Sequence, residues 1–284
     1  MGITGLFQRL FKKGHKADVI QAPLTALGKL ENGIRQHVDV QGSIYPTIRF
    51  AYSTSDLPEK AAHVVVEKRL KQFASPAVSI LYLDGEPALE KQETHEDRSK
   101  NRSKALAAAA QNTELLAELI QNGQHVRKHH FADVENNLRK AFGWEISQRQ
   151  GLVQYLRSQG WTVVESETEA DVEIGRVCKP NDIVVSGDSD LLMYNNVNHL
   201  WRPWRKGQLL HYSVPDILKM FDLSRPQWTA LGIVSANDYG KNISGLGIGS
   251  NFGIIKSLQG NDVPSLIQEY LHSELVALKT VDAN

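Results

Sequence analysis

Carboxylates stand where short apolar runs end or helices begin in this 284-residue chain, and this pattern limits both its fold and its chemistry. Apolar runs bounded by turn residues are typical of buried strands, and parallel strands bring their carboxyl ends to one edge of a sheet. Acids gathered there repel one another unless cations neutralise them. The sequence therefore predicts an α/β fold with a metal site. The acids are Asp39, Asp84, Glu167, Glu169, Asp188, Asp190 and Asp238.

Short apolar segments alternate with longer helical patterns along the chain. Strands are expected at 34–40, 78–83, 161–164 and 183–185, with a hairpin at 200–212 that turns at 206–207. Helices are expected at 44–50, 58–73, 89–120 (as one or two helices), 134–141, 148–158, from Ser166 onward, 214–220 and 227–234. This alternation favours a mainly parallel central sheet flanked by helices, in a single domain that spans 1–284.

Composition places the chain among ordinary globular proteins, at 41% hydrophobic and 23% charged residues. One cysteine, Cys178, excludes an internal disulfide and suits a reducing compartment. No apolar run approaches the roughly 20 residues of a membrane span, and the N-terminus lacks the apolar core of a signal peptide. We therefore expect a soluble, intracellular protein with no membrane partner.

The formal net charge of zero argues at first against a nucleic-acid partner. Removing the seven clustered acids from the 32 acidic residues, however, leaves 25 against 32 basic ones. If cations neutralise the cluster, the remaining surface is basic. A mixed surface with no polyanionic partner is the alternative that composition alone leaves open.

Two of the motifs that carry these acids also have structural explanations. Asp188 and Asp190 stand two residues apart after a strand, where both can face one Mg²⁺ or Mn²⁺, but an Asx turn would explain them equally well. Ser166 and Glu169 fit a capping box at the start of a helix. Asp39 and Asp84 are harder to explain structurally, because aspartate is depleted in strands and rarely buried without a partner.

A series of short motifs runs in order from residue 1 to about 260. They are Met1–Leu6, Asp39 followed by Ser43-Ile44-Tyr45, Leu83-Asp84-Gly85 followed by Lys91 and Arg98, Ser166–Ala170, Gly187–Asp190, and Asn237-Asp238-Tyr239 followed by Gly245–Gly249. In this order they resemble the motifs of the flap endonuclease/XPG-type 5′ nucleases, which have a PIN-like α/β fold.

The resemblance implies a metal-dependent, structure-specific 5′ nuclease that hydrolyses phosphodiesters in branched or flapped DNA. All seven acids would hold two Mg²⁺ ions, for which Mn²⁺ can substitute, and Asp188 would be catalytic. Two cations about 4 Å apart can activate water and neutralise the leaving oxygen. Such a pair needs several carboxylates, which accounts for seven acids rather than two.

The resemblance also assigns basic and aromatic residues. Lys91 and Arg98 would be catalytic and reach the scissile phosphate, and Arg102 would bind nucleic acid one turn further along the same helix face. A solvated helix surface is the alternative for this face. Tyr45 would stack on an unpaired base, or else belong to the core. Gly2 would let the N-terminal backbone approach the duplex.

Two substructures are expected within the domain. A helical arch at about 88–135 would admit a 5′ single strand, and a helix–turn–helix at about 226–260 would dock the duplex. In the latter, Gly245, Gly247 and Gly249 would bind duplex phosphates and a K⁺ ion through backbone groups. The family usually has a basic residue just after this loop, where this chain has Ser250 and Asn251.

The sequence leaves the partner open in several respects. Branched DNA with a free 5′ strand is the first expectation, an RNA-acting nuclease of the same fold is a second, and a non-catalytic nucleic-acid-binding scaffold is a third. We expect a monomer. The chain shows no basic tail with a clamp-binding peptide after the helix–turn–helix, so binding to a replication clamp is not expected. In a eukaryote the protein would act in the nucleus.

Overall fold

The computed structural model describes residues 2–12, 17–21, 33–53, 58–85, 92–205, 207–237, 243 and 245–281. These residues form a seven-stranded sheet in the order β1-β7-β6-β5-β2-β3-β4. The strands are β1 Asp18–Gln21, β2 Gln36–Asp39, β3 Ser79–Leu83, β4 Thr162–Glu165, β5 Ile183–Val185, β6 His199–Pro203 and β7 Gln208–Ser213. Pairing is parallel from β4 through β3, β2 and β5 to β6, and antiparallel from β6 through β7 to β1. The predicted mainly parallel sheet is confirmed.

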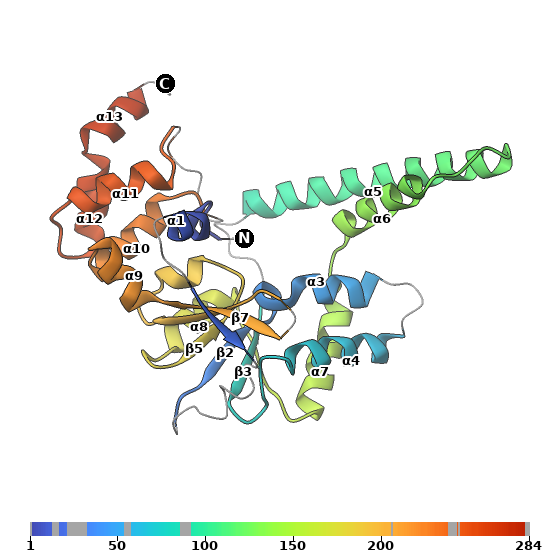
Figure 1. The fold of residues 1–284 in the computed structure, drawn as a ribbon, viewed down its shortest axis with the longest axis horizontal. Helices are drawn as coiled ribbons and strands as arrows, with labels where there is room; N and C mark the ends of the chain where they lie inside the picture. The colour runs from blue at the N-terminus through green and yellow to red at the C-terminus, as the bar shows by residue number, and fades with distance from the viewer. Residues whose placement is uncertain are drawn as a thin grey trace.

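Helices flank this sheet on both faces (Figure 1). Among the described helices, none combines the length and the apolar character that a membrane span requires. The helices are α1 Leu6–Lys12, α3 Val40–Ser53, α4 Glu59–Leu70, α5 Gln92–Gln121, α6 Lys128–Ala141, α7 Ile146–Ser158, α8 Ala170–Val177, the 3₁₀ helix η2 Asp190–Met193, α9 Val214–Phe221, α10 Arg225–Val234, α11 Ile248–Ser257, α12 Val263–Leu271 and α13 Glu274–Val281.

Alternation along the strands divides the core into two layers. Leu81, Leu83 and Val185 face α3, α4 and α7, whereas Tyr82 and Val184 face α8, η2 and the C-terminal helices. Successive strand residues point to opposite faces, so a parallel sheet covered on both sides needs apolar residues in succession. The continuous apolar runs that predicted the strands have this origin.

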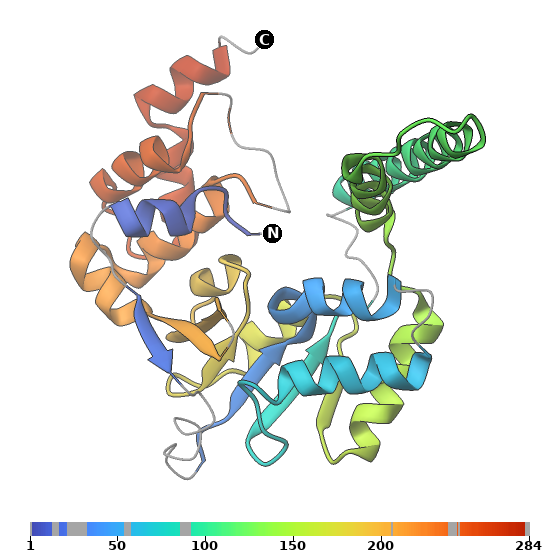
Figure 2. The same cartoon turned by 45° about the vertical axis from the view of Figure 1, so that its right-hand side comes forward.

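Helices α5 and α6 form an antiparallel pair that projects from the body as a long arm (Figures 1 and 2). The segment expected to contain one or two helices is a single helix of 30 residues. Ala105 and Ala109 are buried, and small side chains four residues apart permit close packing of two helices. No side chain of α6 is buried, so the arm is largely a surface structure.

The helix expected from Ser166 begins instead at Ala170, with Glu169 as its N-cap and no side-chain capping bond. The capping-box interpretation of Ser166 and Glu169 is therefore wrong. The Ser166 N–H donates to the carbonyl of Leu83, which continues the pairing of β4 with β3 for one more residue. Strand pairing has outweighed the local capping signal. Helices α1, α12 and α13 and strand β1 were not predicted.

Glu67 on α4 is a buried carboxylate that joins three elements. It accepts hydrogen bonds from Trp161 Nε1 at 3.1 Å and the Tyr155 hydroxyl at 2.9 Å, and it pairs with Lys71 Nζ at 2.8 Å. Burial acts to raise the pKa of Glu67, but the bonds from Lys71, Trp161 and Tyr155 outweigh it and hold that pKa below its usual value. The ionised form is therefore stabilised in the folded protein.

We expect Glu67→Gln to lower the free energy of unfolding by about 1–3 kcal/mol at pH 7, the cost of leaving buried donors without a charged acceptor. Because the folded-state pKa of Glu67 is lowered, its ionised carboxylate contributes fully to stability above the unfolded-state pKa near 4.3. This contribution is lost as pH falls through the folded-state pKa. The difference from wild type should therefore shrink below about pH 4. Urea unfolding measures it. Glu59→Gln, on the same helix with its side chain 58% exposed, is the control and should change stability by under about 0.5 kcal/mol. Equal losses in both variants would contradict the assignment.

Candidate metal and nucleic-acid site

Asp39 ends β2 and is held by two neighbouring segments. Its Oδ1 accepts the N–H of Gly42 at 2.8 Å, and its Oδ2 accepts the Ser186 hydroxyl at 2.7 Å. The first bond closes the turn into α3, and the second comes from the residue after β5. Since β2 pairs in parallel with both β3 and β5, the segments that carry Asp84 and Asp188 begin on either side of Asp39.

The electrostatics of Asp39 show that these carboxylates act on one another. Burial, together with the charges of Asp84 and Asp188, raises the pKa of Asp39 to about 7 against the opposing bonds from Gly42 and Ser186. Asp39 is only 6% exposed. A divalent cation would turn these repulsions into attractions. Hard carboxylate oxygens suit Mg²⁺ or Mn²⁺, so the residues present fit the predicted metal.

The loop after β5 places Asp188 and Asp190. The N–H of Asp188 donates to Ser186 Oγ at 2.9 Å, and the N–H of Asp190 donates to Asp188 Oδ1 at 3.0 Å. The predicted alternative, an Asx turn, is therefore present. It fixes the two acids relative to each other, and it links Asp188 through Ser186 to Asp39. Asp190 then begins η2 and is 8% exposed.

Asp84 directly follows β3 and is hydrogen-bonded to the start of α8. Its Oδ1 accepts the N–H of Ala170, the first residue of α8, at 2.9 Å. The N–H of Gly85 donates to the Thr168 carbonyl at 2.5 Å, and a Cβ on Gly85 would collide with the carbonyl oxygens of Ser166 and Glu167. The Asp84–Gly85 turn thus lies against the 166–170 segment. Within it Glu169 is 9% exposed, whereas Glu167 is fully on the surface.

The N-terminal backbone lies against the same loop. Gly2 has a φ of +98°, and a Cβ there would collide with Ser189 Oγ and approach Asp188 Oδ1 to 2.5 Å. The N–H of Thr4 donates to the Ala236 carbonyl at 3.0 Å. Only glycine fits this position. The structure therefore places Gly2 beside the predicted ligand Asp188.

The carboxylates do not form a closed cage. In the described ranges, no three of them bring one oxygen each within 4.8 Å of the other two. This spacing is compatible with Mg²⁺, which keeps several waters and takes only one or two carboxylates directly. The predicted ligand Asp238 and the predicted catalytic Lys91 lie outside the described residues. The metal roles of all seven acids stay predictions.

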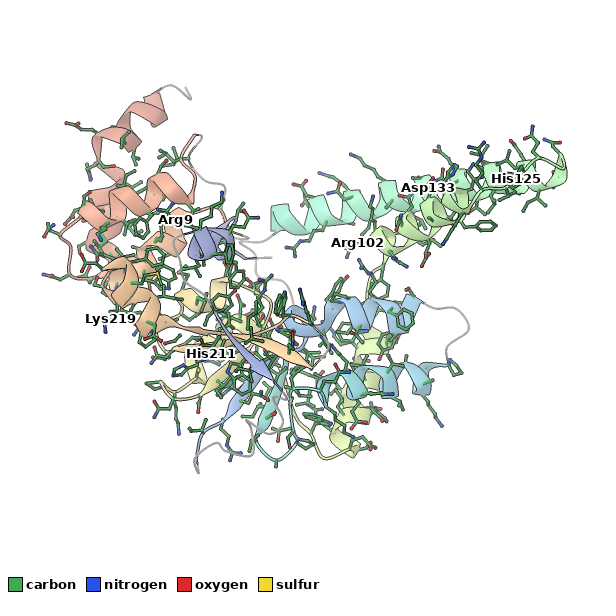
Figure 3. All side chains as sticks on the ribbon, in the orientation of Figure 1. Arg9, Arg102, His125, Asp133, His211 and Lys219 are labelled. Carbon is green, nitrogen blue, oxygen red and sulfur yellow. The ribbon has the colours of Figure 1, made fainter. Side chains whose placement is uncertain are left out.

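A cavity of about 620 Å³ lies where the arm meets α3. Tyr45, Arg98 and Arg102, which the sequence pointed to, all line it. Tyr45 is half-buried, with its ring centroid 6.1 Å from that of Phe142, so it packs on a neighbour and also borders the cavity. Figure 3 shows Arg102 on α5, in the part of the arm nearer the body, well short of His125. The lining contains four cationic side chains and no carboxylate: Arg98, Arg102, Lys104 and Lys140.

Lys140 and Phe142 also line this cavity and were not predicted from the sequence. Both follow from the packing of α6 against α5, which brings residues about 40 positions apart to one surface. The basic pair Arg139-Lys140 in the last turn of α6 was the signal available in the sequence. A helix C-terminus favours cations in any protein, so that signal did not indicate a site.

Helices α10 and α11 occupy the predicted helix–turn–helix. Gly245 has a φ of +79° in the turn, Gly247 is the N-cap of α11 without a side-chain cap, and Gly249 lies in its first turn. A Cβ on Gly249 would come within 3.1 Å of Arg9 Nη1. Arg9, which Figure 3 labels on α1, also has its guanidinium carbon 4.5 Å from the centroid of the Phe252 ring. A basic residue from α1 therefore stands beside this turn, which the sequence did not reveal.

Asn251 lies just after the Gly245–Gly249 loop, where the family resemblance predicts a basic residue and this chain has none. It is fully buried, its Nδ2 donates to the Val234 carbonyl at 2.8 Å, and its Oδ1 accepts the Tyr270 hydroxyl at 2.8 Å. It joins α10, α11 and α12. Its role is to hold these helices together, since its side chain does not reach solvent.

Asp39→Asn provides a test of the buried carboxylate. A folded-state pKa near 7, above the ordinary 3.8, means that ionisation costs stability, so metal-free wild-type protein loses stability as pH rises from about 4 to 7. In EDTA at pH 8, we expect Asp39→Asn to melt at a higher temperature than wild type, by at least the 2–4 °C that about 1 kcal/mol produces. The difference in melting temperature between Asp39→Asn and wild type should be smaller at pH 5. Added Mg²⁺ should raise the melting temperature of wild type only.

The matched control is Glu167→Gln, which removes an exposed carboxylate and should leave the melting temperature in EDTA unchanged. Differential scanning calorimetry over pH 5–8 makes the comparison. A lower melting temperature for Asp39→Asn at pH 8 would show that its charge is stabilising, contrary to this account.

Comparisons with known proteins agree with this geometry. No family model matches the chain. Flap endonuclease 1-A of Physcomitrium patens is 26% identical over 264 residues, which cover 87% of this chain and 62% of the relative. Flap endonuclease 1 of Glycine max is 25% identical over 203 residues, which cover 68% of this chain and 50% of the relative. The chain thus spans about half to three-fifths of the length of these relatives.

Solved structures share the fold. The catalytic core of Rad2 in complex with a DNA substrate aligns with a TM-score of 0.60 at 15% identity, over all of this chain and 76% of that one. Human GEN1 with Holliday junction DNA aligns at 0.55 and 14%, over 99% and 61%. Flap endonuclease-1 from Methanococcus jannaschii aligns at 0.52 and 14%, over 94% and 82%. In sequence, the chain is similar to plant flap endonucleases, and it shares the PIN-like fold of these solved nuclease structures.

Proposed function

We propose that this protein is a metal-dependent, structure-specific 5′ nuclease that hydrolyses phosphodiesters in branched or flapped DNA. The observation that carries the proposal is the buried Asp39, whose charge is opposed by Asp84 and Asp188 at the sheet edge. Carboxylates perturbed in this way cluster at functional sites, where a cation or a substrate uses their charge. The similarity to flap endonucleases and to DNA-bound nuclease cores supports the same reading.

The chain's own groups would divide the work. Asp39, Asp84, Glu169, Asp188 and Asp190, with Glu167 and Asp238, would hold two Mg²⁺ ions. When bound, such a pair supplies an activated water and neutralises charge on the leaving oxygen. Ser186 and Gly42 hold Asp39 in place, and Ser186 also receives the Asp188 N–H, so one hydroxyl orients two of the acids.

The cationic cavity at the base of the arm would bind the substrate's single strand. Arg98, Arg102, Lys104 and Lys140 attract phosphates, and Arg98, with Lys91, would contact the scissile one. Tyr45 and Phe142 offer aromatic faces to an unpaired base. Because such stacking does not depend on sequence, this site favours structure over sequence as the basis of recognition.

The α10–α11 turn would hold the duplex. Glycines in the turn expose backbone N–H groups to phosphates, and Arg9 adds a cation beside Gly249. A GEN-1 structure with a TM-score of 0.53 to this chain is described as binding potassium. By analogy, we propose a K⁺ ion at Gly245–Gly249. We further propose that the protein acts as a monomer.

The catalytic assignment predicts Mg²⁺-dependent cleavage of DNA that carries a 5′ flap. We expect Asp188→Asn to lower the rate at saturating Mg²⁺ by on the order of 100-fold or more, because an acid that positions transition-state charge stabilisation is lost. Product release from end-labelled flap DNA measures it. An RNA version of the same substrate, run in parallel, distinguishes the DNA nuclease from an RNA nuclease. Equal rates for wild type and Asp188→Asn would refute the assignment, and binding without cleavage of either substrate would identify a non-catalytic scaffold.

Arg98 and Lys100 form a matched pair on α5. Of the two, Arg98 lines the cavity and Lys100 does not. A hydrogen bond to a charged group contributes about 1.5–3 kcal/mol, so Arg98→Ala should slow cleavage about 10- to 100-fold. Lys100→Ala removes the same charge from the exposed face and should change the rate less than about threefold. Similar losses in both variants would point to general electrostatic attraction instead of a specific contact.

A further inference from the structure

A second group of side chains of types that can bind a metal lies in the core, apart from the carboxylate edge. It consists of His37 on β2, Cys178 at the C-cap of α8 and Asp182 just before β5, and we call it the His37 cluster. One ligand atom from each lies within 4.8 Å of the other two. His37, Cys178 and Asp182 are each 3% exposed. Their atoms are nitrogen, sulfur and oxygen, unlike the all-oxygen set at the carboxylate edge.

Neighbouring groups hold the cluster in a fixed geometry. The Tyr82 hydroxyl bonds Nδ1 of His37 at 2.9 Å, which directs Nε2 toward Asp182 Oδ2 at 3.1 Å. The N–H groups of Arg35 and Lys179 donate to the two oxygens of Asp182 at 2.9 Å each. Metal-bound histidines characteristically have such a partner on the second ring nitrogen, and metal-bound carboxylates are similarly held.

Hydrogen bonding alone explains His37 and Asp182 but not the position of Cys178. Buried cysteines commonly serve as small apolar side chains. Here the thiol faces a carboxylate, and its own bond, to the Lys179 carbonyl at 3.5 Å, is weak. Burial, with the charge of Asp182, raises the pKa of Cys178 to about 12. A dication between the two would convert an unfavourable neighbour into a shared ligand, with the thiol proton released to solvent.

We propose that His37 Nε2, Cys178 Sγ and Asp182 Oδ2 bind one Zn²⁺ ion, with water in the fourth position. Mixed nitrogen, sulfur and oxygen ligands select Zn²⁺ over Mg²⁺. Nitrogen and oxygen ligands at 2.0–2.1 Å from a tetrahedral ion lie about 3.3 Å apart, close to the 3.1 Å between His37 and Asp182. The inference does not rest on nuclease activity.

The ion would join elements that are distant in the sequence. It would connect β2 to the segment between α8 and β5. Its ligand His37 stands two residues before Asp39 on the same strand. Residues two apart on a strand share a face about 6.6 Å from each other. Zn²⁺ should therefore stabilise the folded protein by mass action.

Cobalt provides a direct test because the chain has a single cysteine. We expect one equivalent of Co²⁺, added to reduced, metal-free protein, to produce a thiolate-to-cobalt charge-transfer band, and one equivalent of Zn²⁺ to abolish it. Only Cys178 can supply that thiolate. Cys178→Ser should remove the band, and Asp182→Asn should weaken Zn²⁺ binding. Asp188→Asn, which alters the carboxylate edge, should retain both band and affinity.

Tyr82→Phe tests the positioning role of the tyrosine. It removes only the hydroxyl that holds Nδ1 of His37, so it should keep the band but weaken Zn²⁺ binding about 10- to 100-fold. Absence of a band in folded wild type would overturn the inference. A band that persists in guanidinium chloride would also do so, because it would report binding to the unfolded chain. Wild type that shows the band without cleaving DNA would refute only the nuclease proposal.

Discussion

The parallel pairing of β2 with both β3 and β5 is the constraint on which the rest of this structure depends. It aligns Val38 with Leu81 and Val185, so that Asp39 emerges next to Ser186 and between the strands that lead to Asp84 and Asp188. A register shift of one residue would turn His37 and Asp39 to the opposite face, into the apolar layer of α3 and α4. Burial of Val38, Leu81 and Val185 therefore fixes the placement of the acids.

This placement of acids at the carboxyl ends of the strands lowers the stability of the metal-free fold. Asp39, a carboxylate that is 6% exposed and is repelled by Asp84 and Asp188, destabilises the metal-free fold when ionised, and the apolar layers on either side must offset this cost. The hydroxyl of Ser186 and the N–H of Gly42 reduce the cost without removing it, since they leave the pKa of Asp39 raised. A structure without a role for these acids would replace them, and this is why the edge points to function.

The sequence predicted what local patterns determine and missed what distant contacts determine. The strands at 78–83 and 183–185 were predictable, because both faces of the sheet are covered and the runs are continuously apolar. Asp84 as the acceptor for the first N–H of α8 was not, because the bond joins residues 86 positions apart. Arg9 beside α11 was hidden for the same reason. At Ser166, a local capping rule gave the wrong start because pairing with β3 took the backbone N–H.

Charge separation explains how a chain of zero net charge could bind a polyanion. Arg98, Arg102, Lys104 and Lys140 gather at the base of the arm, whereas Asp39, Asp84 and Asp188 gather at the sheet edge. Phosphates are drawn to the first group and repelled by the second until cations neutralise it. If the protein acts as proposed, cations that permit the approach of DNA would in turn be held more tightly when its phosphates arrive, because linkage is reciprocal. In the proposed function, the two groups would thus be thermodynamically coupled through the ligands they share.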